Sequence, residues 1–159
     1  MARATWTVLA LASTLAACGQ GASGSAGGSA QPSAQPSGDA KALLATLPAP
    51  YRDADLENGA AHFSLCRSCH TITKGGADMT GPNLYGVFGR KAGAKADYAY
   101  SDALKAKGLI WDAATLDQWL AGPQAFVPGT KMSFPGLKDD KDRRDVIGYL
   151  KVASSGGPS

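Results

Sequence analysis

Two cysteines and a histidine crowd into the stretch Phe63–Thr71, which reads FSLCRSCHT. Two residues separate Cys66 from Cys69, and His70 follows immediately. Thiols at this spacing can add to the two vinyl groups on one edge of a haem and form thioethers, while the adjacent imidazole faces the iron. The pattern CxxCH therefore predicts one covalently attached haem c, with Cys66 and Cys69 as its anchors and His70 as a ligand of the metal.

Three other uses of these side chains fit the sequence less well. A zinc site needs about four ligands, and the cysteines and histidines of this stretch all lie within nine residues, with no second distant pair. A thioredoxin-like redox pair would require a βαβ pattern around it, and the sequence has none. A structural disulfide between Cys66 and Cys69 would leave His70 without a role.

A second axial ligand has to come from another part of the chain. Met79 follows His70 by nine residues, whereas Met132 lies far along the chain in the Pro- and Gly-containing stretch PGTKMSF. His62 precedes the motif on the helix that enters it, so it cannot easily reach the far face of a haem. A lone methionine more often fills a core, but a restrained loop can hold a thioether at a metal, and Met132 is therefore the leading candidate.

Four segments of the folded region carry helix signals. The expected helices run from Asp53 or Asp55 towards Cys66, from Ser101 to Gly108, from Asp112 to Gly122, and from Asp139 or Asp140 to about Val152. No segment shows the alternation of a strand, so the expected fold class is all-α. The intervening loops are long and rich in Gly and Pro, which implies that a large buried ligand completes the core.

The N-terminus has the features of an export signal. Arg3 precedes an apolar run that is too short to cross a bilayer, which takes roughly 20 residues, so residues 1–17 are expected to be a cleaved signal peptide. The run ends in LAAC, which resembles the lipobox of bacterial lipoproteins and implies that Cys18 becomes a lipidated N-terminus. The alternative is an ordinary signal peptide, with Cys18 discarded.

Residues 18–50 have the composition of a tether between Cys18 and a folded domain. Residues 19–38 contain only Gly, Ser, Ala, Gln and Pro, and a weak apolar patch at Leu43, Leu44 and Leu47 precedes Pro50. A segment without large apolar residues cannot form a core, so a flexible linker is expected. The domain is then expected at residues 51–154, with a short disordered tail at residues 155–159.

The overall composition limits the kind of partner. The chain has 159 residues and a formal net charge of +3 at pH 7. Its length suits one ordinary domain with tails. The charge is mild and forms no long block of one sign, so no nucleic acid partner is expected.

Five longer stretches, in this order, resemble class I c-type cytochromes, which include the mitochondrial-type cytochrome c and its bacterial relatives. They are GAAHFSLCRSCHT, GPNLYGVFGRKAG, YAYSDALKAKGLIW, TLDQWLAGPQAFVPGTKMSFPGLK and RRDVIGYLK. The resemblance extends from Leu56 to Val152 and is far more specific than CxxCH alone. It implies the small all-α fold of that family, with helices and Gly/Pro-rich loops around one covalent haem c. Gly59 and Phe63 of the first helix would cross the last helix at Tyr149 and Leu150.

The resemblance also implies a role for each matching residue. Cys66 and Cys69 would be the thioether anchors, His70 the proximal ligand and Met132 the distal ligand. The carbonyl oxygen of Pro82 would accept a hydrogen bond from the ring N–H of His70 and so fix the orientation of that ligand.

Five further residues would surround the haem by the same resemblance. Tyr100 and Trp111 would hydrogen-bond a buried propionate, and Arg90 would help to neutralise it. Thr130 and Trp119 would line the side of the methionine. The tryptophans could otherwise be plain core residues, and Arg90 a solvated surface residue.

The expected function is that of a membrane-tethered periplasmic electron carrier. It would shuttle single electrons through a His/Met-ligated haem, from a quinol-oxidising cytochrome complex to a terminal oxidase or another redox protein, in a respiratory or photosynthetic chain. The expected location is the periplasmic side of a bacterial membrane, with lipid on Cys18, and a soluble periplasmic protein is the alternative. A haem peroxidase-like enzyme or a redox- or gas-sensing module is the alternative function. The protein is expected to be a monomer.

Relatives that dock by charge carry lysines around the exposed haem edge, and this chain departs from that pattern. Leu65 precedes Cys66, and Gln124 and Ala125 occupy the usual lysine pair before the methionine loop. Leu104 stands where the family often has an asparagine near the haem. A strongly basic docking face is therefore not expected.

Overall fold

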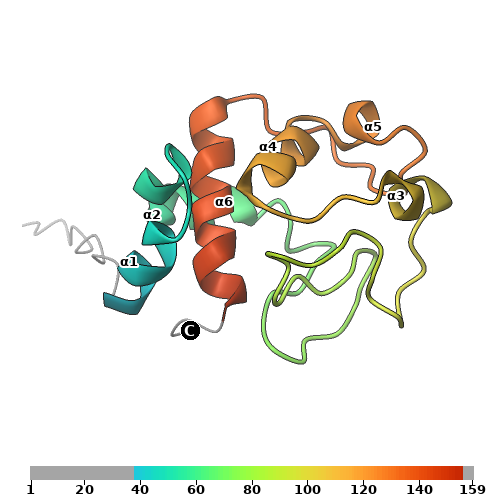
Figure 1. The fold of residues 1–159 in the computed structure, drawn as a ribbon, viewed down its shortest axis with the longest axis horizontal. Helices are drawn as coiled ribbons and strands as arrows, with labels where there is room; N and C mark the ends of the chain where they lie inside the picture. The colour runs from blue at the N-terminus through green and yellow to red at the C-terminus, as the bar shows by residue number, and fades with distance from the viewer. Residues whose placement is uncertain (1–37, 156–159) are drawn as a thin grey trace, which may run out of the picture. The chain divides into compact units, whose positions relative to one another are not determined.

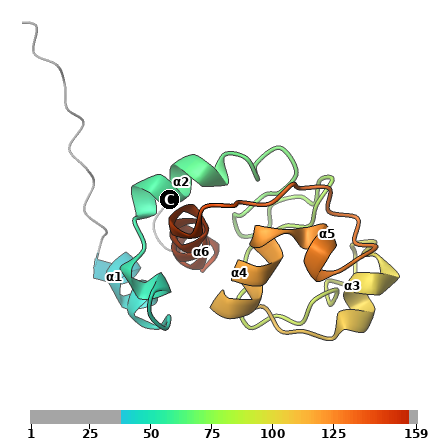
Figure 2. The same cartoon turned by 90° about the horizontal axis from the view of Figure 1, so that it is seen from above.

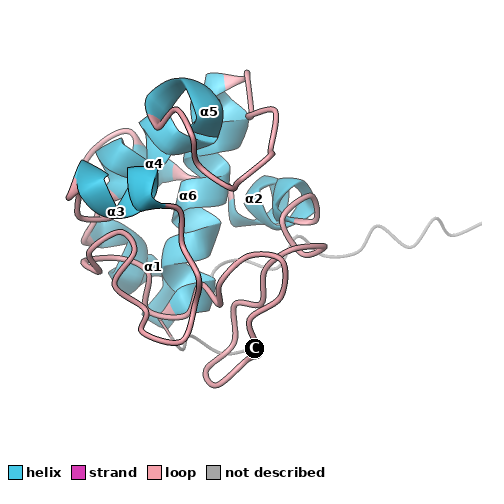
Figure 3. Cartoon of the chain, turned by 90° about the vertical axis from the view of Figure 1, so that its right-hand side faces the viewer, coloured by secondary structure: helices cyan, strands magenta, loops and turns pink. Residues whose placement is uncertain are grey.

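The computed structural model describes residues 38–155 of the chain. Six α-helices and one 3-10 helix follow one another there: α1 Gly38–Ala45, η1 Tyr51–Asp53, α2 Leu56–Phe63, α3 Asp102–Lys107, α4 Ala113–Ala121, α5 Pro123–Phe126 and α6 Asp140–Ser154. Within these residues there is no strand, only an isolated antiparallel bridge between Lys91 and Ile110, and long loops connect the helices (Figure 3). The all-α fold class is confirmed.

The N-terminal segment is described only in part. The expected signal peptide at residues 1–17, Cys18 and the linker up to residue 37 lie outside the described residues, as do residues 156–159. Among the helices of residues 38–155, none is both long enough and apolar enough to cross a membrane. The lipid anchor at Cys18 therefore stays a prediction.

The side chains expected to cap helices do so. In the first turns of α2, α3, α4 and α6, backbone N–H groups donate to the side chains of Asp55, Ser101, Asp112 and Asp139, respectively. Such bonds satisfy donors that the start of a helix otherwise leaves without a partner. The four expected helices are confirmed. The short helix α5 is an addition: Pro123 occupies its first turn directly after Gly122, which was expected only to end α4.

Helix α6 has α2 packed on one side and α4 on the other (Figure 1 and Figure 2). The crossing with α2 is at Gly59, where a Cβ atom would lie 2.2 Å from the backbone oxygen of Asp145. Only glycine permits so close an approach of two helices. Beside it, the ring centroids of Phe63 and Tyr149 lie 5.3 Å apart. These contacts confirm the expected crossing of the first and last helices of the domain.

A buried carboxylate joins the same two helices. The side chain of Asp145 has no exposed surface, and its oxygens accept hydrogen bonds from four donors. These are Asp55 N at 3.0 Å, Asn58 Nδ2 at 2.9 Å, Lys141 Nζ at 2.6 Å and Arg144 Nε at 3.0 Å. Burial by itself raises the pKa of this carboxyl group, but the donors outweigh burial and hold the pKa below its usual value.

The end of the expected linker is folded, which corrects the sequence-based boundary. Gly38–Ala45 form α1, and Ala40, Leu44 and Leu47 are buried, with at most 6% of their surface exposed. Both α1 and η1 pack against α6. The leucines looked like a weak patch because the apolar surface that covers them belongs to a helix about a hundred residues later. The folded part therefore includes residues 38–50, ahead of the expected start at Tyr51.

Candidate functional site

A cavity of about 360 Å³ lies among the loops and helices of the described part of the chain. Its volume is in the range of pockets that hold cofactors, roughly 300–1,000 Å³. All ten residues expected to surround a haem line it: Cys66, Cys69, His70, Pro82, Arg90, Tyr100, Trp111, Trp119, Thr130 and Met132. The fold thus brings to one cavity residues from the end of α2, the loops before α3 and α4, α4 itself and the loop between α5 and α6.

The two cysteines reach the cavity because the chain keeps turning after α2 ends at Phe63. Backbone hydrogen bonds run from Cys66 N to Phe63 O at 2.9 Å, from Cys69 N to Cys66 O at 3.1 Å and from His70 N to Cys66 O at 2.9 Å. Both cysteines are free, half-buried thiols. Burial and, to a smaller extent, the neighbouring Cys69 raise the pKa of the Cys66 thiol to about 11. A thiol that stays protonated at neutral pH is a poor ligand for a free metal ion. Within the described residues, no group of three or more Asp, Glu, His or Cys side chains could hold such an ion.

The histidine of the motif is held in one orientation. His70 Nδ1 lies 2.7 Å from the carbonyl oxygen of Pro82. Because a carbonyl oxygen only accepts hydrogen bonds, Nδ1 carries the proton and Nε2 keeps its lone pair. Burial lowers the pKa of His70 against the opposing effect of the bond to Pro82, so the imidazole is neutral, which is its metal-binding form. The expected contact between His70 and Pro82 is present.

Gly81 leaves room for the imidazole ring. A Cβ atom at this position would lie 2.2 Å from Cε1 and 2.6 Å from Nδ1 of His70. Any other residue would push the ring out of its place or move the backbone next to Pro82. The two thiols, the neutral imidazole and this space for its ring together fit a covalently attached haem.

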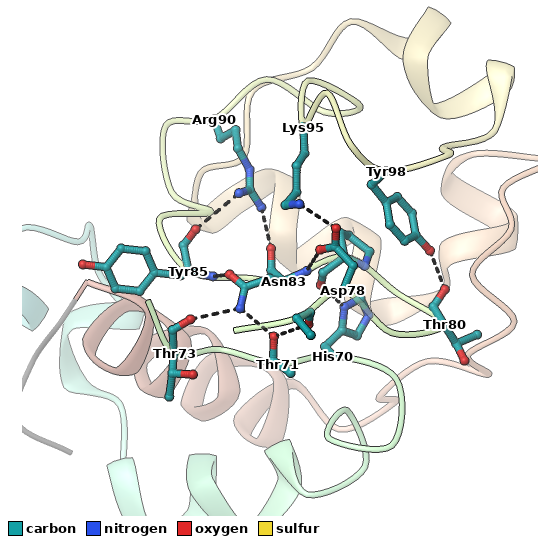
Figure 4. A network of polar contacts seen from close by, with 12 residues as sticks. His70, Thr71, Thr73, Asp78, Thr80, Asn83, Tyr85, Arg90, Lys95 and Tyr98 are labelled. Carbon is teal, nitrogen blue, oxygen red and sulfur yellow. Dashed lines mark hydrogen bonds and ion pairs between the residues drawn. The ribbon is translucent and has the colours of Figure 1, made fainter. Parts of the chain in front are cut away.

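Asn83 organises the loop behind His70, and sequence reasoning missed it. This buried residue donates from Nδ2 to Thr71 Oγ1 at 2.6 Å and to Thr73 O at 3.0 Å, and its Oδ1 accepts from Tyr85 N at 2.9 Å. Its backbone N–H donates to Asp78 Oδ1 at 2.7 Å. Figure 4 shows Asn83 at the centre of these contacts, with His70 nearby. The sequence feature that could have pointed to Asn83 is its position directly after Pro82 in the stretch GPNL.

Two contacts join this loop to the segment before α3 (Figure 4). Lys95 Nζ lies 2.5 Å from Asp78 Oδ2, and the hydroxyl group of Tyr98 donates to the carbonyl oxygen of Thr80. The hydrogen bond from Lys95 is the main reason why the pKa of Asp78 is lowered. Two loops without regular structure are therefore linked to each other beside the cavity.

Hydrogen-bond donors and aromatic rings occur together in the cavity wall. Arg90 donates to two backbone carbonyl oxygens, at 3.2 and 3.3 Å, and its guanidinium has further N–H groups. Burial raises the pKa of the Tyr100 hydroxyl, so this group remains a donor at neutral pH. Trp111 is buried, with its ring centroid 5.4 Å from that of Trp119. This combination suits a large apolar ring that carries acidic substituents.

One of the two internal methionines lines the cavity. Met132 does so, and its backbone N–H donates to Oγ1 of the buried Thr130 at 3.3 Å. Met79 is not among the lining residues, and 48% of its surface is exposed. His62 also lies outside the cavity wall, where its Nε2 is 3.1 Å from Asp142 Oδ1. The choice of Met132 over both alternatives agrees with this placement.

Comparisons with known proteins agree with the geometry of the cavity. The family model of cytochrome c matches residues 56–154. The chain belongs to the cytochrome c family. It is 54% identical to cytochrome c from Theileria parva over 104 residues, which are 65% of this chain and 90% of the relative. It is 45% identical to cytochrome c from Kluyveromyces lactis over 108 residues, which are 67% of this chain and 98% of the relative.

A solved structure is also similar to this cytochrome. Cytochrome cH from Methylobacterium extorquens is 54% identical and superimposes with a TM-score of 0.56, covering 62% of this chain and 98% of that chain. The family match begins at Leu56, so α1 and η1 precede it.

Family membership defines the cofactor and the type of activity. The protein is a cytochrome c with one c-type haem attached through its cysteine pair, and it is an electron carrier rather than an enzyme. The bound haem supplies an iron that takes up and releases one electron. The residues of this chain contribute the two cysteine sulfurs for attachment, an oriented imidazole and a largely apolar wall.

Proposed function

We propose that His70 and Met132 are the axial ligands of the iron in this electron carrier. The observation that carries the proposal is that both side chains line one cavity, whereas Met79 and His62 do not. His70 presents a neutral nitrogen with its other nitrogen bonded to Pro82. A His/Met pair raises the reduction potential, which suits a carrier that accepts electrons late in a transport chain.

Replacement of each methionine tests this assignment. Met132→Ala is expected to keep the covalent haem, to lower the reduction potential, and to lose the long-wavelength absorption band that a thioether–iron(III) bond produces. Added imidazole should then bind readily. Met79→Ala is the matched control and should change none of these properties. A loss of the band in Met79→Ala but not in Met132→Ala would show that the ligand assignment is wrong.

The same proposal assigns the haem propionates to the polar part of the wall. Tyr100 and Trp111 would donate hydrogen bonds to a propionate, and Arg90 would offset its negative charge. Thr130 and Trp119 would border the thioether of Met132. Their common place in the cavity wall supports these roles.

We further infer that the haem domain works on a lipid tether at the periplasmic side of a bacterial membrane. The support lies in the sequence: LAAC ends an apolar N-terminal run, and a stretch of Gly, Ser, Ala, Gln and Pro follows Cys18. A lipidated N-terminal cysteine would carry at least two acyl chains, which anchor a protein far more firmly than one. A flexible segment behind the anchor would raise the effective concentration of the domain near its partners.

Removal of the anchoring thiol tests this location. Cys18→Ala, combined with an ordinary signal cleavage site, is expected to release an intact, haem-loaded cytochrome into the soluble fraction with an unchanged reduction potential. Wild-type protein should stay with the membrane in high salt and carry lipid by mass spectrometry. Wild-type protein that washes off with salt and carries no lipid would contradict the tether and favour a soluble periplasmic carrier.

The proposed partners are a quinol-oxidising cytochrome complex as electron donor and a terminal oxidase or another redox protein as acceptor. Electron flow through membranes with and without the cytochrome tests this directly. Inhibition of each complex in turn should leave the haem fully oxidised or fully reduced, according to the side of the chain that is blocked. A redox state that no inhibitor changes would argue against both partners.

A further inference from the structure

Gln124 reaches from α5 to the loop that carries Met132. Its Nε2 atom lies 2.8 Å from the backbone oxygen of Thr130 and 3.0 Å from the backbone oxygen of Met132. Both partners only accept hydrogen bonds, so the amide has to present its NH2 group, whose two hydrogens serve the two carbonyl oxygens. One exposed side chain thus holds the main chain on both sides of Lys131.

Besides the bond from Thr130 N to Val127 O at 3.1 Å, few other hydrogen bonds hold the described loop at this point. Between α5 and α6 the chain contains no helix, and the backbone N–H of Met132 is bonded to Thr130 within the same loop at 3.3 Å. Lys131 Nζ donates to Ala99 O at 2.7 Å. Gln124 therefore connects the main chain of Met132 itself to a helix.

We propose that Gln124 is a positioning residue that keeps the thioether of Met132 in the cavity. Gln124 is not among the residues that line the cavity, so any effect on the iron has to pass through the loop. The inference rests on the proposed ligation by Met132. The proposal gives Gln124 a part in holding the metal ligand, at a position where lysine-rich relatives carry a surface charge.

The expected effect on imidazole binding depends on how often the loop is open, with the thioether of Met132 displaced from the iron. Imidazole can reach the iron only while the thioether is displaced, so its apparent affinity scales with the open fraction. Two neutral hydrogen bonds at the surface change such an equilibrium by about tenfold. Gln124→Ala should therefore bind imidazole about tenfold more tightly than the wild type, with a weaker thioether–iron(III) absorption band.

Substitutions of different hydrogen-bonding capacity separate this role from a general effect of size or charge. Gln124→Glu keeps the size but sets an acceptor against two carbonyl oxygens, so it should bind imidazole at least as tightly as Gln124→Ala. Gln124→Arg keeps N–H donors and should stay close to the wild type. Gln118 is exposed on α4, and Gln118→Ala and Gln118→Glu are the matched controls, with no expected change.

The experiment is a titration of the oxidised, haem-loaded full chain with imidazole, followed by absorbance, together with a double-mutant cycle. In the Met132→Ala background there is no thioether to displace, so adding Gln124→Ala should have little effect. Unchanged affinity in both Gln124→Ala and Gln124→Glu would overturn the proposal. So would an effect of Gln124→Ala that persists undiminished without Met132. If Met132→Ala by itself leaves the affinity and the band unchanged, the ligand assignment is wrong, and the proposal fails with it.

Discussion

Replacement of the buried Asp145 by asparagine should destabilise the haem-loaded protein. The side chain is completely buried between α2 and α6, where its two oxygens accept four hydrogen bonds. Asparagine has nearly the same shape but replaces one oxygen by an NH2 group. Wherever that group lies, it faces two donors and leaves them without an acceptor.

The size of the destabilisation depends on whether the donors that lose their acceptor can bond to water instead. Loss of one partner from a buried charged pair costs about 3–5 kcal/mol. Lys141 and Arg144 have 55% and 26% of their side-chain surface exposed, so both can turn towards water. The N–H of Asp55 belongs to the main chain at the start of α2, so it cannot turn away from the place of the lost acceptor. We therefore expect Asp145→Asn to lower the free energy of unfolding by about 3 kcal/mol at neutral pH.

The pH dependence gives a second and sharper expectation. The pKa of Asp145 is lowered in the folded state, whereas an aspartate in the unfolded chain has a pKa of about 3.9. Its contribution to stability is therefore fully present above about pH 4 and is lost as the pH falls through the lower, folded value. The difference in free energy of unfolding between the wild type and Asp145→Asn should be constant near neutral pH and should become smaller in acid.

Guanidinium unfolding of the oxidised, haem-loaded protein, followed by circular dichroism, measures both quantities. Asp97→Asn makes the same chemical change at an exposed residue and should stay within about 0.5 kcal/mol of the wild type. The reasoning is refuted if Asp145→Asn is as stable as the wild type at neutral pH. It is also refuted if the difference is as large in acid as at neutral pH.

Two further predictions concern α1 and the haem itself. Leu44→Ala should lower the free energy of unfolding by about 2–4 kcal/mol without changing the reduction potential, because α1 does not line the cavity. Chemical denaturation and redox titration measure the two quantities, and a shifted potential would contradict the separation of α1 from the haem site. Cys66→Ala combined with Cys69→Ala should lose haem and helical circular dichroism together, because the ligand fills a cavity of about 360 Å³ within the core; a well-folded, protease-resistant form without haem would contradict this.

The chemistry of the site could be predicted from the sequence because it depends on residues a few positions apart. The spacing of Cys66, Cys69 and His70 decides which cofactor they can attach, and it needs no knowledge of the fold. The helix caps are equally local, since each joins a side chain to a backbone N–H within three positions. The choice between Met79 and Met132 rested on the Gly and Pro around Met132, which already indicated a restrained loop.

The tertiary structure alone decided which surfaces and polar groups meet across long separations. The leucines of α1 looked like part of a linker because their apolar partner is α6, far along the chain. The donors around Asp145 include one that is 90 positions away, and the network of Asn83 joins loops that have no regular pattern. The sequence of a short segment shows which of its side chains can be buried or hydrogen-bonded. Whether they find partners depends on the free energy of the whole packed chain, because those partners lie on segments that meet only in the folded structure.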